Sequence, residues 1–522
     1  MKKEEFIVLS SKEQLNDKQK SIPLEEGMSL YRILQKEGVA LSAPCAGNGT
    51  CGACKIKVLR GNLPITDKDK KFLSEEQLKS GWRLACQAFP SKTCEVFVPT
   101  EEYTAVTGYE DKEKKGMQTK TVFMKQQGAD QSYAIAIDLG TTTLAYELFS
   151  LETQNTVNVL SSVNPQRIYG ADVVSRMEQS NNGRKDMLKI ILRQGMRKDI
   201  AELIKKIEPE KIQRIAISGN TAMIHLMMGY SCEGLGRYPF TSVTLDFIQT
   251  DAQSLGLMEQ TVPVFVSPGI SAYVGGDILM GLAAQNILED KKPCLFLDLG
   301  TNAEMALTDG NGKIHVTSAP AGPAFEAANI SCGVGSVEGA VSSICIKKGQ
   351  AAVTTIGKKE AIGFCGSGIL EAVYEFWKNH IIDETGLLID DYFESGFSVG
   401  KLKITQTDIR QIQLAKSAVF SAITILMKHA GVKPQEIEKI YLAGGFGYYL
   451  NIEKAIGIGL LPRAFTGKIQ TIGNSCLFGT KEYLLGHYTK DRIQKIKSFC
   501  EEIYLSNDSS FQTVFMENMN FN

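Results

Sequence analysis

Four cysteines near the start of the chain are spaced so that their thiolates could bind one metal centre. Cys45, Cys51, Cys54 and Cys86 form the pattern C-x5-C-x2-C-x31-C. Zinc sites made of cysteine usually contain two C-x2-C pairs, whereas here the first gap is five residues long and the fourth cysteine stands alone. Iron–sulfur clusters also use four thiolates. The spacing therefore favours a [2Fe–2S] cluster over a structural zinc ion, and it leaves Cys94 as a structural thiol.

A second set of candidate residues lies in two similar segments that could bind phosphate groups. Residues 135–148 resemble residues 295–307, about 160 positions later, and this match aligns Asp138 with Asp298. Each segment is an apolar run, an Asp-Leu-Gly-Thr turn and a second apolar run. Glycine lets a tight turn expose its backbone N–H groups, threonine adds hydroxyl donors, and aspartate can bind Mg²⁺ directly or through water. The candidate contacts are Gly140, Thr141, Thr142 and Thr143 in the first hairpin and Gly300, Thr301 and Asn302 in the second.

A third segment could complete a nucleotide site between the two hairpins. Residues 440–447 read IYLAGGFG, which predicts a strand running into a glycine turn. A flat adenine ring could lie against the backbone of Gly444, Gly445 and Phe446. Residues 218–221 also follow a predicted strand, and they either line the same cleft or cap the next helix. The chain has no G-x4-G-K-[ST] sequence, which disfavours a P-loop enzyme.

The elements that must position these residues divide the chain into four parts. Residues 1–100 read as short strands with one or two helices, which predicts a compact mixed module. Residues 101–131 are charged and lack an apolar period, so they are predicted to be a linker. From residue 132 strands and helices alternate, as in α/β folds, and the internal repeat predicts two duplicated lobes at 132–290 and 291–522.

Both halves of the chain resemble known families. The cysteine segment is similar to [2Fe–2S] ferredoxins, which implies an α+β fold of the β-grasp type. Residues 132 to about 490 resemble the actin-like (ASKHA) ATPases, which implies an α/β, ribonuclease H-like duplicated domain with ATP and Mg²⁺ between its lobes. The resemblance implies catalytic roles for Asp138 and Asp298, and it matches residues 274–280 to the first connecting helix, with Gly276 and Asp277 at the nucleotide.

Taken together, the two parts resemble the reductive activators of corrinoid-dependent methyltransferase systems. That resemblance implies an ATP-hydrolysing iron–sulfur enzyme that reduces an inactive Co(II) corrinoid protein to Co(I). It also implies a low-potential electron donor, and it leaves a homodimer open. An ATP-gated electron injector for a radical dehydratase and a redox-regulated actin-like kinase remain alternatives.

Composition sets limits on the other functions. The chain has 57 Lys and Arg against 58 Asp and Glu, a net charge of −1, which argues against nucleic acid as the main partner. No stretch of about 18 uninterrupted apolar residues occurs, and the first residues lack an apolar signal segment. We therefore expect a cytoplasmic protein that does not enter the membrane.

Overall fold

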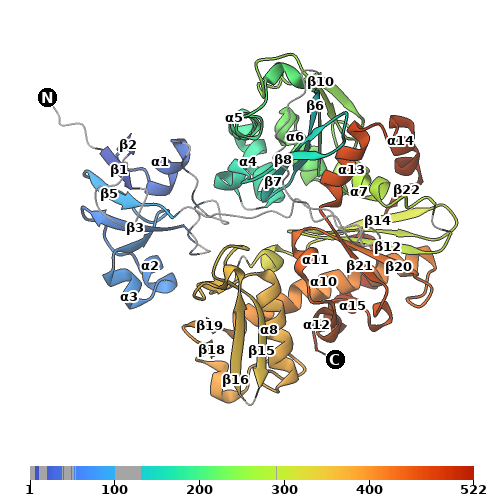
Figure 1. Ribbon diagram of the computed structural model, residues 1–522. Coiled ribbons are helices and arrows are strands. Elements are labelled where there is room, and N and C mark those ends of the chain that lie inside the picture. Colours follow the sequence, from blue (N-terminus) through green and yellow to red (C-terminus); the bar gives the residue numbers. More distant parts are fainter. Residues whose placement is uncertain are drawn as a thin grey trace. The chain divides into compact units, whose positions relative to one another are not determined.

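The computed structural model describes most of the chain, and its described residues form two compact units (Figure 1). One unit combines the N-terminal module with residues 163–195 and 226–236, and the other contains the rest of the described chain. The residues described are 6–10, 20–37, 39, 41, 47, 49, 52, 54–99, 131–170, 172–289, 291–327, 329–347 and 349–521. Residues 101–130 of the predicted linker, together with Cys45 and Cys51, lie outside them.

The N-terminal module is built on a five-stranded sheet of order β2-β1-β5-β3-β4. Its strands are β1 (Phe6–Ser10), β2 (Lys20–Pro23), β3 (Lys55–Arg60), β4 (Trp82–Leu84) and β5 (Cys94–Phe97). β1 and β5 are parallel, and the other pairs are antiparallel. Helix α1 (Leu30–Lys36) begins after the Ser29 cap, and its buried residues share an apolar core with the sheet. The predicted α+β β-grasp fold is confirmed.

The first lobe of the larger unit has a six-stranded sheet of order β10-β11-β9-β6-β7-β8. β6 pairs with β7 in antiparallel and with β9 in parallel orientation. The bounds are β6 (Tyr133–Leu139), β7 (Thr143–Ser150), β8 (Thr156–Val163), β9 (Ile212–Gly219), β10 (Ile248–Asp251) and β11 (Pro263–Val266). Strand β6 is buried on both faces along most of its length, as its apolar run predicts.

The second lobe repeats this arrangement. Its sheet order is β21-β20-β12-β13-β14-β22, and β12 pairs with β13 in antiparallel and with β20 in parallel orientation. The bounds are β12 (Cys294–Leu299), β13 (Ala303–Thr308), β14 (Ile314–Ala319), β20 (Lys439–Ala443), β21 (Ile469–Gly473) and β22 (Cys500–Glu502). When β10 is left out of the first sheet and β22 out of the second, five strands remain in each. Numbered in chain order within each lobe, these five strands follow the same spatial order, 3-2-1-4-5. The predicted duplication is therefore confirmed by strand topology.

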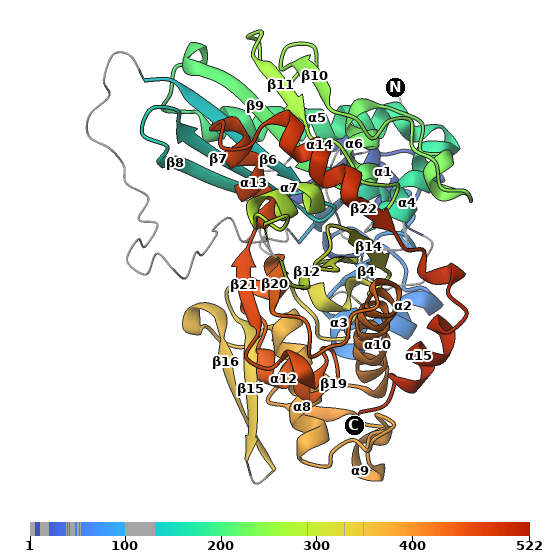
Figure 2. The same cartoon turned by 90° about the vertical axis from the view of Figure 1, so that its right-hand side faces the viewer.

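Two helices cross over between the lobes. Helix α7 (Gly276–Ala284) follows the first sheet in sequence but packs its buried Ile278 and Leu282 with Phe296 of the second sheet. Helix α13 (Ser475–Leu484) follows strand β21 of the second sheet but packs Leu477 with residues of β6 and β9. Figure 2 shows the two helices side by side. They can approach closely because a Cβ on Gly479 would lie 2.2 Å from the carbonyl oxygen of Met280.

The other elements surround these sheets. β15 (Ala340–Lys347), β16 (Gln350–Thr355) and β17 (Gly363–Phe364) form a small sheet, and β18 (Phe397–Val399) pairs with β19 (Leu402–Ile404). The remaining α-helices are α2 (Asp67–Phe72), α3 (Glu75–Lys79), α4 (Val173–Gln179), α5 (Lys185–Leu203), α6 (Thr221–Met228), α8 (Gly366–Lys378), α9 (Asp390–Phe393), α10 (Gln406–Ala430), α11 (Gly445–Tyr449), α12 (Ile452–Gly457), α14 (Lys490–Phe499) and α15 (Phe511–Glu517). Among the described residues, no helix is long and apolar enough to span a bilayer.

Candidate functional site

A cleft in the larger unit brings together nearly all the residues predicted to bind a nucleotide. Both hairpin turns open into it. Gly444, Gly445 and Phe446, which are predicted to contact the adenosine and are called the adenosine segment below, form part of its wall. The predicted residues that line it are Asp138, Gly140, Thr141, Thr142, Thr143, Asp277, Asp298, Gly300, Thr301, Asn302, Gly444, Gly445 and Phe446. Gly276 is different, because a Cβ at that position would meet the Ser267 hydroxyl at 2.0 Å. Among the described residues it does not line the cleft, and it packs at the start of α7, so its contact with a nucleotide stays a prediction.

The two aspartates of the hairpins occupy equivalent places in their sheets. Asp138 pairs with Ala145 in β7 and Ser218 in β9. Asp298 pairs with Glu304 in β13 and Ala443 in β20. The chain that follows Ser218 therefore corresponds to the chain that follows Ala443, and each leaves its sheet at the cleft.

Four carboxylates crowd the inner part of the cleft. Burial, together with the Asp277 and Asp138 charges, raises the pKa of Asp298 to about 7. Burial and then Asp138 raise the pKa of Asp277 to about 7, and burial raises the pKa of Asp138 and of Glu304. Like charges this close are costly unless a cation or a proton neutralises them. This end of the cleft is therefore suited to a hard divalent cation such as Mg²⁺.

Two asparagines at the starts of helices orient the first-lobe aspartate and hairpin. Asn474, just before α13, donates from Nδ2 to Oδ2 of Asp138 at 2.8 Å, and its Oδ1 caps the helix by accepting from the Leu477 N–H. Asn220 donates to the Thr141 hydroxyl at 3.0 Å and accepts from the Met223 N–H at 2.9 Å. Both alternatives for residues 218–221 thus hold, because Asn220 lines the cleft and also caps α6.

The adenosine segment lies against the second hairpin with little room to spare. Gly444 has a φ of +86°, and a Cβ there would lie 2.6 Å from Oδ1 of Asp298. The segment predicted as a glycine turn is in fact the start of helix α11. The Phe446 ring stacks on Phe325, with centroids 4.6 Å apart and planes 14° apart.

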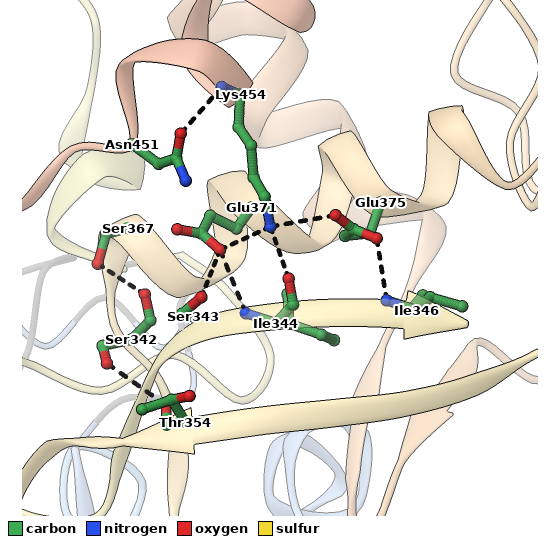
Figure 3. A network of polar contacts seen from close by, with 10 residues as sticks. All are labelled: Ser342, Ser343, Ile344, Ile346, Thr354, Ser367, Glu371, Glu375, Asn451 and Lys454. Atoms are coloured by element: carbon green, nitrogen blue, oxygen red, sulfur yellow. Dashed lines mark hydrogen bonds and ion pairs between the residues drawn. The ribbon is translucent and has the colours of Figure 1, made fainter.

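A buried polar network lies behind helix α8, which forms part of the cleft wall (Figure 3). Helix α8 begins at the cleft with Gly366 and Ser367, and it carries Glu371 and Glu375 about one and two turns further on. Lys454 of α12 contacts Oε2 of Glu371 at 2.8 Å and Oε1 of Glu375 at 3.1 Å. Although burial opposes its charge, hydrogen bonds to these two glutamates raise the pKa of Lys454. The network fixes α8 to α12 and, through the Ile344 and Ile346 N–H groups, to strand β15.

The predicted cluster loop is described at two of its four cysteines. Cys54 and Cys86 are both buried, and a hydrogen bond from Cys54 is the main reason that the pKa of Cys86 falls to about 6. Gly47, Gly49 and Gly52 all have positive φ, and a Cβ on any of them would come within 2.7 Å of a neighbouring side chain. A Cys86 thiol that favours the thiolate, its neighbour Cys54, and glycines at the three left-handed positions 47, 49 and 52 fit a [2Fe–2S] cluster. Cys94 is buried in the module core, and burial raises the pKa of its thiol to about 11.

Several residues of the cleft were not among the candidates that the sequence indicated. Glu304, Glu326, Asn474 and Cys476 line it, and they come from three different parts of the chain. Asn474 could have been noticed as a helix cap after a strand, and Glu326 closes the Ala-Gly-Pro-Ala-Phe-Glu segment 321–326. Neither pattern indicates a cleft before the fold is known.

Three family models match successive parts of the chain. Residues 13–91 match a 2Fe-2S iron-sulfur cluster binding domain, residues 133–290 the RACo middle region, and residues 292–522 the C-terminal, ASKHA domain of RACo. These matches support a [2Fe–2S] cluster and ATP as the cofactors.

Individual proteins match over most of the chain. The corrinoid activation enzyme RamQ of Eubacterium limosum is 31% identical over 74% of this chain and 70% of its own length. A [Co(II) methylated amine-specific corrinoid protein] reductase of Methanosarcina barkeri is 23% identical over 74% of this chain and 76% of its own. The solved structure of a reductive activator for corrinoid,iron-sulfur protein covers 99% of this chain and 98% of its own, with a TM-score of 0.69 and 23% identity, and so shares the fold.

Proposed function

Because the chain belongs to the family of corrinoid activation enzymes, we propose that it reactivates a corrinoid protein by reducing its cobalt from Co(II) to Co(I) with one electron and the energy of ATP. The observation that carries this proposal is the presence, in one chain, of a [2Fe–2S] cluster binding domain and a duplicated cleft with an aspartate at the same place in each lobe. The first part can deliver one electron, and the second can bind a nucleotide.

The reaction needs both parts because the electron must move uphill. A shortfall of 100 mV in potential costs about 2.3 kcal/mol for one electron, so a modest gap leaves little Co(I) at equilibrium. Nucleotide binding or hydrolysis can close that gap if the affinity of the lobes for the Co(II) protein differs between nucleotide states. The first electron comes from a separate low-potential donor.

We assign roles to the residues on this basis. Cys45, Cys51, Cys54 and Cys86 hold the cluster. The hydroxyl and backbone groups of 140–143 and 300–302 bind the phosphates, while Asp138 and Asp298 hold Mg²⁺ or its water shell. Gly444, Gly445 and Phe446 bind the adenosine.

The test mixes reduced protein with a Co(II) corrinoid protein, with and without Mg-ATP, and follows loss of the Co(II) EPR signal. Co(I) should form only with Mg-ATP. The Cys51→Ala variant should bind ATP but deliver no electron, and the Asp298→Ala variant should be reducible but inactive with ATP. Cys94→Ala is the matched control, because it removes a buried cysteine that we place outside the ligand set. Equal formation of Co(I) without nucleotide would overturn the ATP-driven proposal.

A further inference from the structure

A fifth carboxylate of the cleft, Glu326, is separate from the four inner ones. It ends the short 3-10 segment Pro323–Glu326 that follows β14. Its Oε2 accepts a hydrogen bond of 3.0 Å from the Thr142 hydroxyl, and its Oε1 accepts one of 2.9 Å from the Thr301 hydroxyl. One side chain therefore contacts the phosphate turns of both lobes.

The contacts place Glu326 at the phosphate end of the cleft. Thr142 and Thr301 are the hydroxyls expected to donate to phosphate oxygens, and their own oxygens are 3.4 Å apart. The inner carboxylates influence one another's pKa values, whereas Glu326 contacts only donors in the hydrogen bonds described for it. Its surroundings are thus those of an acceptor facing hydroxyls, not those of a cation ligand.

The backbone that carries Glu326 is held from several sides. Phe325 stacks on Phe446 of the adenosine segment. A Cβ on Gly366, at the start of α8, would lie 1.7 Å from the Phe325 carbonyl oxygen. Ala327, which follows, has a φ of +59°. This packing fixes the carboxylate between the two turns, with only its own torsions free.

We propose that Glu326 is the general base for ATP hydrolysis, a role that rests on the ATP-using activity proposed above. When the γ-phosphate takes the hydroxyls of Thr142 and Thr301, the Glu326 carboxylate loses these donors. Two anions cannot face each other directly without a large cost, so a water molecule between them is the favoured partner. That water lies where attack on the phosphorus must begin.

The chemical step follows from this placement. The water oxygen forms a bond to the γ-phosphorus, and the bond from that phosphorus to the β,γ-bridging oxygen breaks with its electron pair leaving on ADP. One water proton goes to the Glu326 carboxylate and is passed to solvent or to the product phosphate. General base catalysis of this kind typically contributes about 10²- to 10⁴-fold in rate.

The alternative is that Glu326 only clasps the two lobes together before ATP binds. The two roles predict different effects of Glu326→Gln. This variant keeps the size of the side chain, and its single amide oxygen can still accept from both threonines, because Oε1 of Glu326 lies 3.2 Å from the Thr142 hydroxyl and 2.9 Å from the Thr301 hydroxyl. A lost base lowers kcat for ATP by about 10²- to 10⁴-fold, leaves the affinity for a non-hydrolysable ATP analogue within about threefold, and abolishes the acidic limb of the kcat–pH profile. If Glu326 is only a clasp, Glu326→Gln keeps both threonine contacts and should leave the hydrolysis rate, the analogue affinity and the kcat–pH profile close to those of wild type.

The experiment measures single-turnover hydrolysis by rapid quench, analogue binding by calorimetry, and the kcat–pH profile for the full chain without a corrinoid protein. Glu326→Asp, which keeps a carboxylate, should retain the acidic limb at a reduced rate. Glu360→Gln is the matched control, because Glu360 is an exposed carboxylate paired with Lys401. Hydrolysis by Glu326→Gln within threefold of wild type would overturn the inference. Absence of hydrolysis in the wild-type chain would also overturn the inference, and it would leave nucleotide binding alone to drive the proposed reduction.

Discussion

Asn474 and Asp138 are joined by a 2.8 Å hydrogen bond although they lie at opposite ends of the ATPase sequence. Asn474 donates through Nδ2 and uses Oδ1 to cap α13, so one side chain both starts the second crossing helix and orients an aspartate of the first hairpin. The position of the helix and the position of the proposed cation site are therefore coupled through a single amide.

Replacing Asn474 separates these two tasks. Asn474→Asp keeps the capping oxygen but loses the donor and adds a negative charge beside Asp138, so Mg-ATP affinity should fall at least tenfold with little loss of stability. Asn474→Ala loses both functions and should also lower the free energy of unfolding by about 1 kcal/mol. Calorimetric titration with Mg-ATP and urea unfolding measure the two effects. Equal affinities in Asn474→Asp and wild type would contradict this coupling.

The crowded carboxylates predict how pH affects stability. Burial and the neighbouring carboxylates raise the pKa of Asp277 and Asp298 from the ordinary 3.8 to about 7 in the folded chain, so between these values the folded state binds more protons than the unfolded state. Stability without a cation should therefore fall as pH rises from about 4 to about 7.

Mg²⁺ should reverse this loss by neutralising the ionised carboxylates. The rise in Tm caused by Mg²⁺ should be at least twice as large at pH 8 as at pH 5, as measured by thermal unfolding in EDTA and in Mg²⁺. Asp298→Asn should reduce that pH dependence. An equal effect of Mg²⁺ at both pH values would show that the carboxylates do not bind it.

Gly444 offers a steric test of the adenosine wall. Gly444→Ala places a methyl group 2.6 Å from Oδ1 of Asp298, which must move, so Mg-ATP affinity should fall at least tenfold, or about 1.4 kcal/mol. Gly431→Ala is a matched control, since Gly431 has a φ of +66° at the end of α10 and a Cβ there meets nothing within 4 Å. The left-handed backbone at this position should lower the free energy of unfolding of Gly431→Ala by about 1–2 kcal/mol and leave its Mg-ATP affinity unchanged. Similar affinities for the two variants would refute the contact with Asp298.

Lys454 provides a test of the network behind α8. Lys454→Met leaves Glu371 and Glu375 buried without their cation and should destabilise the fold by about 3–5 kcal/mol in urea unfolding. The exposed Lys401–Glu360 pair has the same 2.8 Å separation as the Lys454–Glu371 pair, and Lys401→Met should cost less than about 1 kcal/mol. A small effect at Lys454 would mean that the glutamates find other partners.

The parts of the fold that were predictable are those encoded locally. Each phosphate hairpin is a continuous segment, so the buried strands around Asp138 and Asp298 could be recognised directly, and their bounds follow the apolar runs. Glu326 and Asn474 could not be placed, because their partners Thr142, Thr301 and Asp138 are distant in sequence. The packing of Gly276 against Ser267 had no sequence signal for the same reason, and its contact with a nucleotide stays a prediction. All four cluster ligands also remain predictions, and Cys45 and Cys51 lie outside the described residues.

The crossing of α7 and α13 also limits how such a protein can change over generations. Because α13 packs on the first sheet and α7 on the second, a gene cut near residue 291 would encode two halves that each lack one of the helices that pack on their own sheet. Neither half can be exchanged for that of a relative without bringing along the surface that its borrowed helix must fit. The two lobes must therefore evolve together, because a substitution on α13 has to remain compatible with the strands of the first lobe that it packs against.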